Sequence, residues 1–243
     1  MTTIAAQRPL VTNSLCTQQA LIRLQFDKPV EMTRVQGKSI RGAIAGQFLE
    51  ERLLHQHRED GSVEYRYPLV QYKRLGRECI IVGLGCGAEL ITDLPMVQEE
   101  FELERMSCRL LSREMIVREV KVTVRDQPVS YSLLTPWLAL NEENYARYRA
   151  GSLVERKRLL ERILIGNILS MSKGLGYVVT EKIEVSRLDV YPVRTSVRLK
   201  GVEMTGFKGT FAVNFELPDL IGLGKSVSRG FGTVRRIARE EQG

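Results

Sequence analysis

The chain contains only two histidines, His55 and His57, and Arg58 directly follows the second. An imidazole titrates near neutral pH, so it can take up and release a proton during a reaction, and a neighbouring guanidinium can hold a phosphate. The three residues therefore predict acid–base chemistry on a phosphate group. We expect His57 to transfer the proton, with His55 as its close rival, and Arg58 to bind the reacting phosphate.

Two other interpretations of the histidines stay open. A metal ion would need a carboxylate as its third ligand, because the chain has no third histidine, and its four cysteines form no Cys-x-x-Cys pair. We therefore predict no metal and no other cofactor. The remaining alternative is that both imidazoles lie on the surface and have no function.

A segment near the end of the chain, residues 222–232, combines glycines with small and basic residues, and we call it the glycine-rich segment. Its predicted binding residues are Gly222, Gly224, Lys225, Ser226, Arg229, Gly230 and Gly232. Glycine lets a backbone approach a ligand without a Cβ in the way, and N–H groups beside cations can bind phosphate. A plain surface loop is the alternative. A P-loop is excluded, because Asp219 occupies the position where that motif requires its first glycine.

Two further stretches have weaker signals. Gly83 to Ala88 matches the G-x-G-x-x-[GA] pattern of dinucleotide-binding folds, but Pro95 follows too soon for the long helix of a parallel crossover. The stretch from Tyr65 to Lys73 alternates tyrosines with cations. Such a strand can stack bases or can pack in a core, and the sequence leaves both possibilities open.

The composition favours a polyanionic partner. The chain has 243 residues, 43% of them hydrophobic, and its 36 Lys and Arg residues against 29 Asp and Glu give a net charge of +7. Most of the 36 are Arg, whose planar guanidinium forms paired hydrogen bonds with phosphate and stacks on bases, so a nucleic acid is favoured over a membrane surface. The absence of a signal-peptide pattern and of an 18-residue apolar run predicts a soluble cytoplasmic protein with no membrane partner.

The first half of the chain shows the element order that could position these residues. After a loose lead-in over residues 1–17, we expect strands at 20–26, 65–74 and 78–82, a further strand within 97–111, and helices at 40–54 and 88–94. Ser39 is the expected cap of the first helix, and Gly76 the expected turn between two strands. This is the order of a ferredoxin-like unit over residues 18–111.

The second half partly repeats that order. We expect strands at 114–125, 129–134, 185–200, 202–215 and 233–237, with turns at 126–128 and at Gly201. A helix over 153–173 begins at the capping box of Ser152 and Glu155. Its expected apolar stripe consists of Leu153, Leu160, Leu164, Ile168 and Met171.

Three features together resemble the CRISPR repeat-processing endoribonucleases of the RAMP superfamily. They are the first helix with Arg41 and Gly42, the block from Tyr67 to Lys73, and the terminal G-x-G-x5-G-x-G pattern. The resemblance implies an α+β fold of two tandem ferredoxin-like (RRM-like) domains, residues 1–111 and 112–243, and a glycine-rich loop that binds RNA. It also places the catalytic histidines after the first helix. The family's helper tyrosine has no counterpart in the helix, where Ala43 to Ala45 stand instead.

The resemblance implies metal-independent cleavage of precursor CRISPR RNA within its repeats. The 2′-OH would attack its own phosphate, giving 2′,3′-cyclic phosphate and 5′-OH ends. The expected partner is the CRISPR repeat RNA, and the chain would act as a monomer or a homodimer. The alternative is a non-catalytic RNA-binding RAMP subunit of a CRISPR effector complex, which would have the same fold but dispensable histidines.

Overall fold

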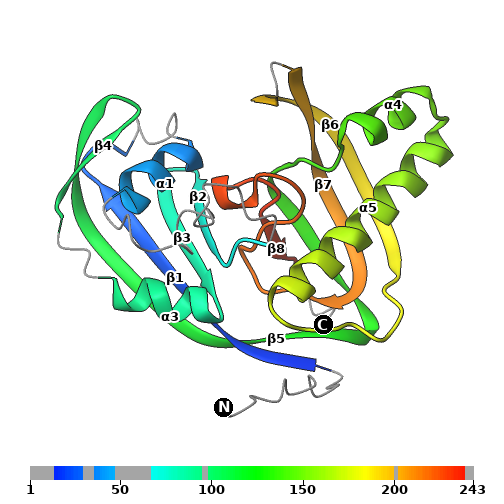
Figure 1. Ribbon diagram of the computed structural model, residues 1–243, viewed down its shortest axis with the longest axis horizontal. Helices are drawn as coiled ribbons and strands as arrows, with labels where there is room; N and C mark the ends of the chain where they lie inside the picture. Colours follow the sequence, from blue (N-terminus) through cyan, green and yellow to red (C-terminus); the bar gives the residue numbers. More distant parts are fainter. Residues whose placement is uncertain (1–13, 30–35, 47–66, 95–97, 200–201, 239–243) are drawn as a thin grey trace, which may run out of the picture.

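The computed structural model describes residues 14–29, 36–46, 67–94, 98–199 and 202–238 (Figure 1). In chain order the elements are β1 (Ser14–Phe26), α1 (Gly37–Ala45), β2 (Val70–Leu75), β3 (Glu78–Leu84), α3 (Cys86–Asp93), β4 (Glu100–Leu103), β5 (Met106–Trp137), α4 (Glu142–Ala150), α5 (Leu153–Gly174), β6 (Val185–Leu199), β7 (Val202–Glu216), the 3-10 turn η2 (Val227–Arg229) and β8 (Val234–Arg236). None of the described helices combines the length and the hydropathy that a bilayer crossing requires.

One long strand, β5, belongs to both halves of the molecule. The main sheet has the antiparallel order β2-β3-β1-β5-β7-β6, and β8 pairs with β5 on the edge opposite β7. The N-terminal half therefore has the strand order β2-β3-β1-β5, and the C-terminal half has the matching order β6-β7-β5-β8. Both are ferredoxin-like arrangements. Figure 1 shows β5 continuing from one half into the other, and the expected domain boundary at residues 111 and 112 lies inside this strand.

The second half lacks one helix of the ferredoxin-like unit. Between β7 and β8 the chain forms the glycine-rich segment with its single 3-10 turn, and this stretch lies between the two halves (Figure 1). Leu220, just before the segment, is buried with Leu21, Ile80 and Val82 on the inner face of the N-terminal sheet. Residues far apart in sequence are thereby joined through one small apolar cluster.

Each half has its own larger hydrophobic core. In the N-terminal half, Ile40 and Ile44 of α1 and Ile91 of α3 pack on the outer face of the sheet. In the C-terminal half, one stripe of α5 packs on β5, β6 and β7, and its fully buried members include Leu164 and Ile168. The apolar periodicity of both helices accounts for this burial.

Most of the expected elements are confirmed, some with different ends. The β2–β3 hairpin turns at Gly76, whose φ of +63° suits glycine, and α5 begins with the predicted capping box of Ser152 and Glu155. The β6–β7 hairpin and the closing strand β8 are also present. The lead-in is shorter than expected, because β1 already starts at Ser14.

Three expectations about the elements are wrong, and one helix was not predicted. Residues 126–128 form no turn, because β5 is continuous there and its register with β7 shifts between Val124 and Val129. A proline fits such an irregularity, where no ladder donor is needed. Ser39 does not cap α1, which begins after Gln36; the Ser39 hydroxyl instead donates to Glu104. Leu153 is 82% exposed and lies outside the apolar stripe. The short helix α4 was not predicted.

Candidate functional site

The residues with the strongest predicted chemistry lie outside the described part of the chain. His55, His57 and Arg58 all fall between residues 47 and 66, so their roles remain predictions. Helix α1 ends at Ala45 with Gly46 as its C-cap, earlier than the predicted end at residue 54. The chain therefore runs toward the histidines from the C-terminal end of α1.

The glycines of the glycine-rich segment are required by contacts with the protein itself. Gly232 has a φ of +63°, and a Cβ built there would lie 1.9 Å from the carbonyl oxygen of Leu223. Gly224 and Gly230 also have positive φ; Gly224 lies against Trp137, and Gly230 against the backbone of β2. Substitution at these positions would therefore disturb the fold before it could disturb a bound ligand.

The backbone N–H groups of the segment are largely used within the chain. Those of Lys225, Arg229, Gly230 and Gly232 donate to carbonyl groups of the protein, and that of Gly222 donates to the side chain of Gln71 at 2.9 Å. A backbone donor that is already paired gives little to a phosphate. Binding chemistry in the segment therefore falls mainly to its side chains.

A buried hydrogen-bond network fixes the start of the segment to the N-terminal half. The Tyr67 hydroxyl donates to the carbonyl oxygen of Gly222 at 2.9 Å, and the Gln71 amide donates to the same hydroxyl at 3.0 Å. Burial raises the pKa of the Tyr67 hydroxyl, so it remains a neutral donor. The network determines the position of the segment relative to β2.

The structure brings Arg229 next to the helix that leads to the histidines. Gly37, the first residue of α1, packs on the Arg229 backbone so closely that a Cβ there would lie 2.2 Å from the Arg229 carbonyl oxygen. The Arg41 guanidinium is 3.4 Å from the hydroxyl of Ser228. The structure thus places Arg41, from the other half of the chain, near the predicted binding residue Arg229.

Arg41 and Arg229 form a pair of like charges. Burial lowers the pKa of the Arg41 guanidinium, and the charge of Arg229 lowers it further. Both groups nevertheless remain cationic at neutral pH. Tyr72 lies near Arg41, and its buried hydroxyl has no hydrogen-bond partner among the described residues. Two cations in one place are suited to binding an anion such as a phosphate.

The other residues predicted in the segment lie on its opposite side or contribute less. Lys225 is partly buried, and its backbone N–H donates to the carbonyl oxygen of Leu138, just after β5. Ser226 has a left-handed backbone conformation with a φ of +55° and precedes the 3-10 turn that carries Arg229. Arg229 is the exposed cation of the segment, whereas Lys225 is held against the C-terminal half.

The stretch of tyrosines and cations before β3 packs in the interior where it is described. Tyr72 and Lys73 are both fully buried. Burial lowers the pKa of the Lys73 amine from 10.5 to about 7, and the amine has no hydrogen-bond partner in the described part of the chain. Core packing is therefore the correct interpretation for these residues, and they offer no platform for stacking bases.

Sequence reasoning missed Ser228 and offered only weak signals for Arg41 and Tyr72. Arg41 was noted as part of a motif, but nothing in its local sequence indicates Arg229 as a neighbour, since the two residues belong to different halves. Ser228 had no signal as a binding residue, and Tyr72 was indicated only as part of a stretch that could stack bases or pack in the core. Within the described ranges, no three His, Cys, Asp or Glu side chains come close enough to share a metal ion.

Comparison with known proteins identifies the family. The model of the Cas6b N-terminal domain matches residues 18–121, and the model of the Cas6b C-terminal domain matches residues 123–237. An uncharacterized protein of Methanocaldococcus jannaschii is 40% identical over 138 residues, which are 57% of this chain and 92% of that protein.

Two solved structures are similar over nearly the whole chain. A crystal structure of Cas6b is 31% identical with a TM-score of 0.80 and covers 92% of this chain and 100% of its own. A crystal structure described as the CRISPR RNA processing endoribonuclease Cas6b is 28% identical with a TM-score of 0.67, covering 90% of this chain and 100% of its own. Both family models together span the two halves and the strand that joins them, and the chain therefore belongs to the Cas6b family.

Proposed function

We propose that the protein is an endoribonuclease that cleaves precursor CRISPR RNA within its repeats. The observation that carries the proposal is the placement of Arg229, from the glycine-rich segment, beside Arg41 on the helix that leads to the two histidines. The Cas6b structure that is 28% identical is named as a CRISPR RNA processing endoribonuclease, which supports the same activity here. The RNA partner would be bound by a monomer or a homodimer of the chain.

The reaction follows from the groups that the chain supplies. A 2′-OH of the RNA attacks the neighbouring phosphorus, and the bond from phosphorus to the 5′-oxygen breaks. One proton leaves the 2′-OH and another is delivered to the 5′-oxygen, so the products carry a 2′,3′-cyclic phosphate and a 5′-OH. His57 or His55 would transfer a proton, and Arg58 would assist at the phosphate.

Arg41 and Arg229 would stabilise the charge that develops on the phosphate. In the attack the phosphorus gains a fifth oxygen ligand, and negative charge accumulates on the non-bridging oxygens. Two guanidiniums already in place can receive that charge without reorganisation. Their mutual repulsion is relieved when the anion binds, so the same pair also favours the bound state.

The proposal is tested by incubating the purified protein with its cognate repeat RNA in EDTA and by determining the ends of the products. We expect cleavage at one position, with a cyclic phosphate on one product and a 5′-OH on the other. The double variant His55→Ala, His57→Ala should bind RNA normally but cleave at least about 100-fold more slowly. Unchanged cleavage by the double variant would reject the histidine mechanism, and no cleavage by the parent protein would favour the non-catalytic RNA-binding subunit.

A further inference from the structure

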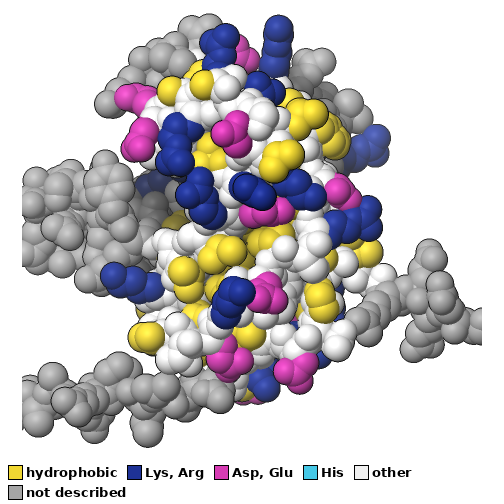
Figure 2. Space-filling view, turned by 90° about the vertical axis from the view of Figure 1, so that its right-hand side faces the viewer, with side chains coloured by type: hydrophobic (Ala, Val, Ile, Leu, Met, Phe, Trp, Pro, Cys, Tyr) yellow, Lys and Arg dark blue, Asp and Glu magenta, His cyan; other side chains and the backbone are white. Residues whose placement is uncertain are grey.

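A cleft of about 790 Å³ lies between α4 and α5 and reaches Val185 at the start of β6. Figure 2 shows the molecule from the side that carries these helices, where Lys and Arg side chains, with some Asp and Glu among them, lie next to hydrophobic side chains. The cleft is distinct from the glycine-rich segment, and none of its lining residues belongs to the site described above.

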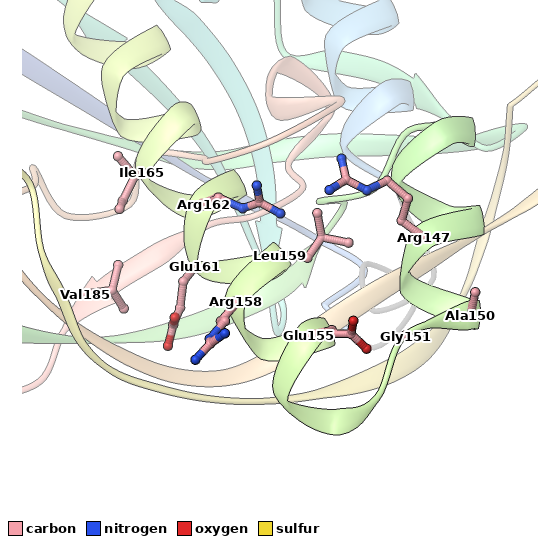
Figure 3. A pocket seen from close by; sticks show the side chains of 10 residues that line it. All are labelled: Arg147, Ala150, Gly151, Glu155, Arg158, Leu159, Glu161, Arg162, Ile165 and Val185. Atoms are coloured by element: carbon pink, nitrogen blue, oxygen red, sulfur yellow. The ribbon is translucent and has the colours of Figure 1, made fainter.

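Two arginines from different helices converge on this cleft. Arg147 extends from α4 and Arg162 from α5, and their guanidinium groups point toward one another across it (Figure 3). Both side chains are exposed, and neither makes a hydrogen bond or an ion pair with another described residue. Each retains the donors that an incoming anion would use.

The cleft lining has three arginines against two carboxylates, and neither carboxylate pairs with Arg147 or Arg162. The Glu155 carboxylate accepts from the backbone N–H of Ser152 at 2.8 Å and from its hydroxyl at 2.7 Å. These hydrogen bonds lower the pKa of Glu155 and keep it at the start of α5. Glu161 points away from Arg147, side by side with Arg158 (Figure 3). The lining therefore has an excess of one positive charge, and Arg147 and Arg162 face one another without a carboxylate between them.

The walls of the cleft add apolar surface to the charge. Leu159 lies between the two guanidinium groups in Figure 3, and Ile165 and Val185 line the same space. Guanidinium donors contact phosphate oxygens, whereas apolar side chains contact sugar and base faces. This combination fits a nucleic-acid strand better than a small inorganic anion, which would make no use of the apolar walls.

Helix α5 connects the cleft with the glycine-rich segment. The rise of an α-helix places Arg162 roughly 18 Å from Gly174 along the axis. Gly174 packs on Tyr67, whose hydroxyl is bonded to Gly222. A stacked strand advances about 3.4 Å per nucleotide, so about five nucleotides would reach from one place to the other. A repeat RNA held at the segment is long enough to enter the cleft.

We propose that the cleft between α4 and α5 binds the backbone of the repeat RNA several nucleotides away from the cleaved phosphate, with Arg147 and Arg162 holding a phosphate between them. The proposal rests on the proposed function, because it takes the repeat RNA as the ligand. It goes beyond that function by assigning a second contact, on the helical face of the C-terminal half. The contact contributes affinity and register and leaves the chemical step to the first site.

The test compares the double variant Arg147→Gln, Arg162→Gln with the charge-matched control Lys157→Gln, Lys173→Gln. Both control lysines are exposed on α5 and do not line the cleft. Equilibrium binding of the full repeat RNA is measured at several salt concentrations, and single-turnover cleavage is measured at saturating protein. Melting temperatures of all variants are compared first, and we expect them to agree because the four side chains are exposed.

We expect the arginine variant to bind the full repeat about 10- to 100-fold more weakly than the control. The slope of log K against log salt should fall by about 1.4, which corresponds to two lost phosphate contacts on a single strand. Cleavage at saturation should be unchanged. Equal affinity and equal slope in the two variants would overturn the proposal and would favour an acidic protein as the partner of this cleft. Failure of the proposed function is a separate result, since the parent protein would then bind RNA without cleaving it.

Discussion

Replacing the buried Lys73 by methionine should stabilise the protein. The Lys73 amine is fully buried, and no described residue accepts a hydrogen bond from it. A buried cation without a partner opposes folding, whereas methionine of similar length fills the same space without a charge. The change therefore removes an unfavourable contribution and leaves the apolar contacts of the stem.

The size of the effect follows from the pKa of the amine. Burial lowers this pKa from 10.5 to about 7, and a difference of that size corresponds to about 5 kcal/mol between the protonation states. Local relaxation reduces the cost in proteins, and replacing buried charges by apolar groups typically gains about 1–4 kcal/mol. We expect the free energy of unfolding of Lys73→Met to exceed that of the parent by an amount in this range at pH 7.

The gain should depend on pH in a defined direction. Above pH 7 the folded protein releases the Lys73 proton, while the unfolded chain keeps it up to pH 10.5, so the unfolded state binds more protons. The stability conferred by this group therefore rises with pH between these values, and the penalty is complete only below about pH 7. The advantage of Lys73→Met should accordingly shrink as the pH approaches 10.5.

Urea unfolding at pH 7 and at pH 9.5 measures the difference directly. The control is Lys157→Met, because Lys157 is an exposed lysine on α5 and its replacement should change the free energy of unfolding little at either pH. If Lys73→Met is less stable than the parent at pH 7, or if its advantage is the same at both values, the assignment of an unpaired buried amine is refuted.

Three further predictions concern stability and are checked by denaturant unfolding. Gly232→Ala should cost at least about 2 kcal/mol, because its Cβ would lie 1.9 Å from a carbonyl oxygen at a φ of +63°. Gly166→Ala, on α5 with open space around it, should instead gain about 0.5–1 kcal/mol, and equal effects at both glycines would contradict the reasoning. Tyr131→Phe should cost about 1–3 kcal/mol by leaving the buried N–H of Leu217 without its 2.8 Å acceptor; a neutral result would show that the N–H finds another. Ser152→Ala should cost about 1 kcal/mol through loss of the capping box, and an unchanged stability would mean that the box adds nothing.

Local sequence signals predicted the elements that are governed by local interactions. The capping box at Ser152 and the positive φ at Gly76 each involve residues within one or two turns of chain, and both are found where the sequence indicated them. The ferredoxin-like order of the first half also followed from the alternation of strand and helix patterns. These features depend on hydrogen bonds and periodicities that a short window contains.

Features that depend on distant residues were not predictable in the same way. Residues 126–128 have the composition of a turn, yet pairing with β7 on either side holds β5 continuous through them. Leu153 has the right spacing for the apolar stripe of α5, but it is the first residue of the helix and its side chain is exposed. In both cases tertiary contacts decided against the local pattern.

The candidate site was predicted in part. The sequence indicated Arg229 as a binding residue, but its neighbour Arg41 is separated from Ser228 by 187 positions, and such a contact depends on how the two halves pack. The binding role of the glycines stays a prediction, and the contacts that require glycine at these positions are with the protein itself. The roles of the two histidines and of Arg58 stay predictions.

The most direct test of the central claim is a double-mutant cycle on Arg41 and Arg229, with single-turnover cleavage of repeat RNA as the readout. Arg41→Gln and Arg229→Gln should each slow cleavage at saturating RNA by about 10- to 1,000-fold, and the double variant should be less impaired than the product of the two effects, because both act on one phosphate. Lys38→Gln, an exposed change on the same helix α1, should cleave nearly as fast as the parent. Full cleavage rates in both arginine variants, or effects no larger than that of Lys38→Gln, would contradict the account.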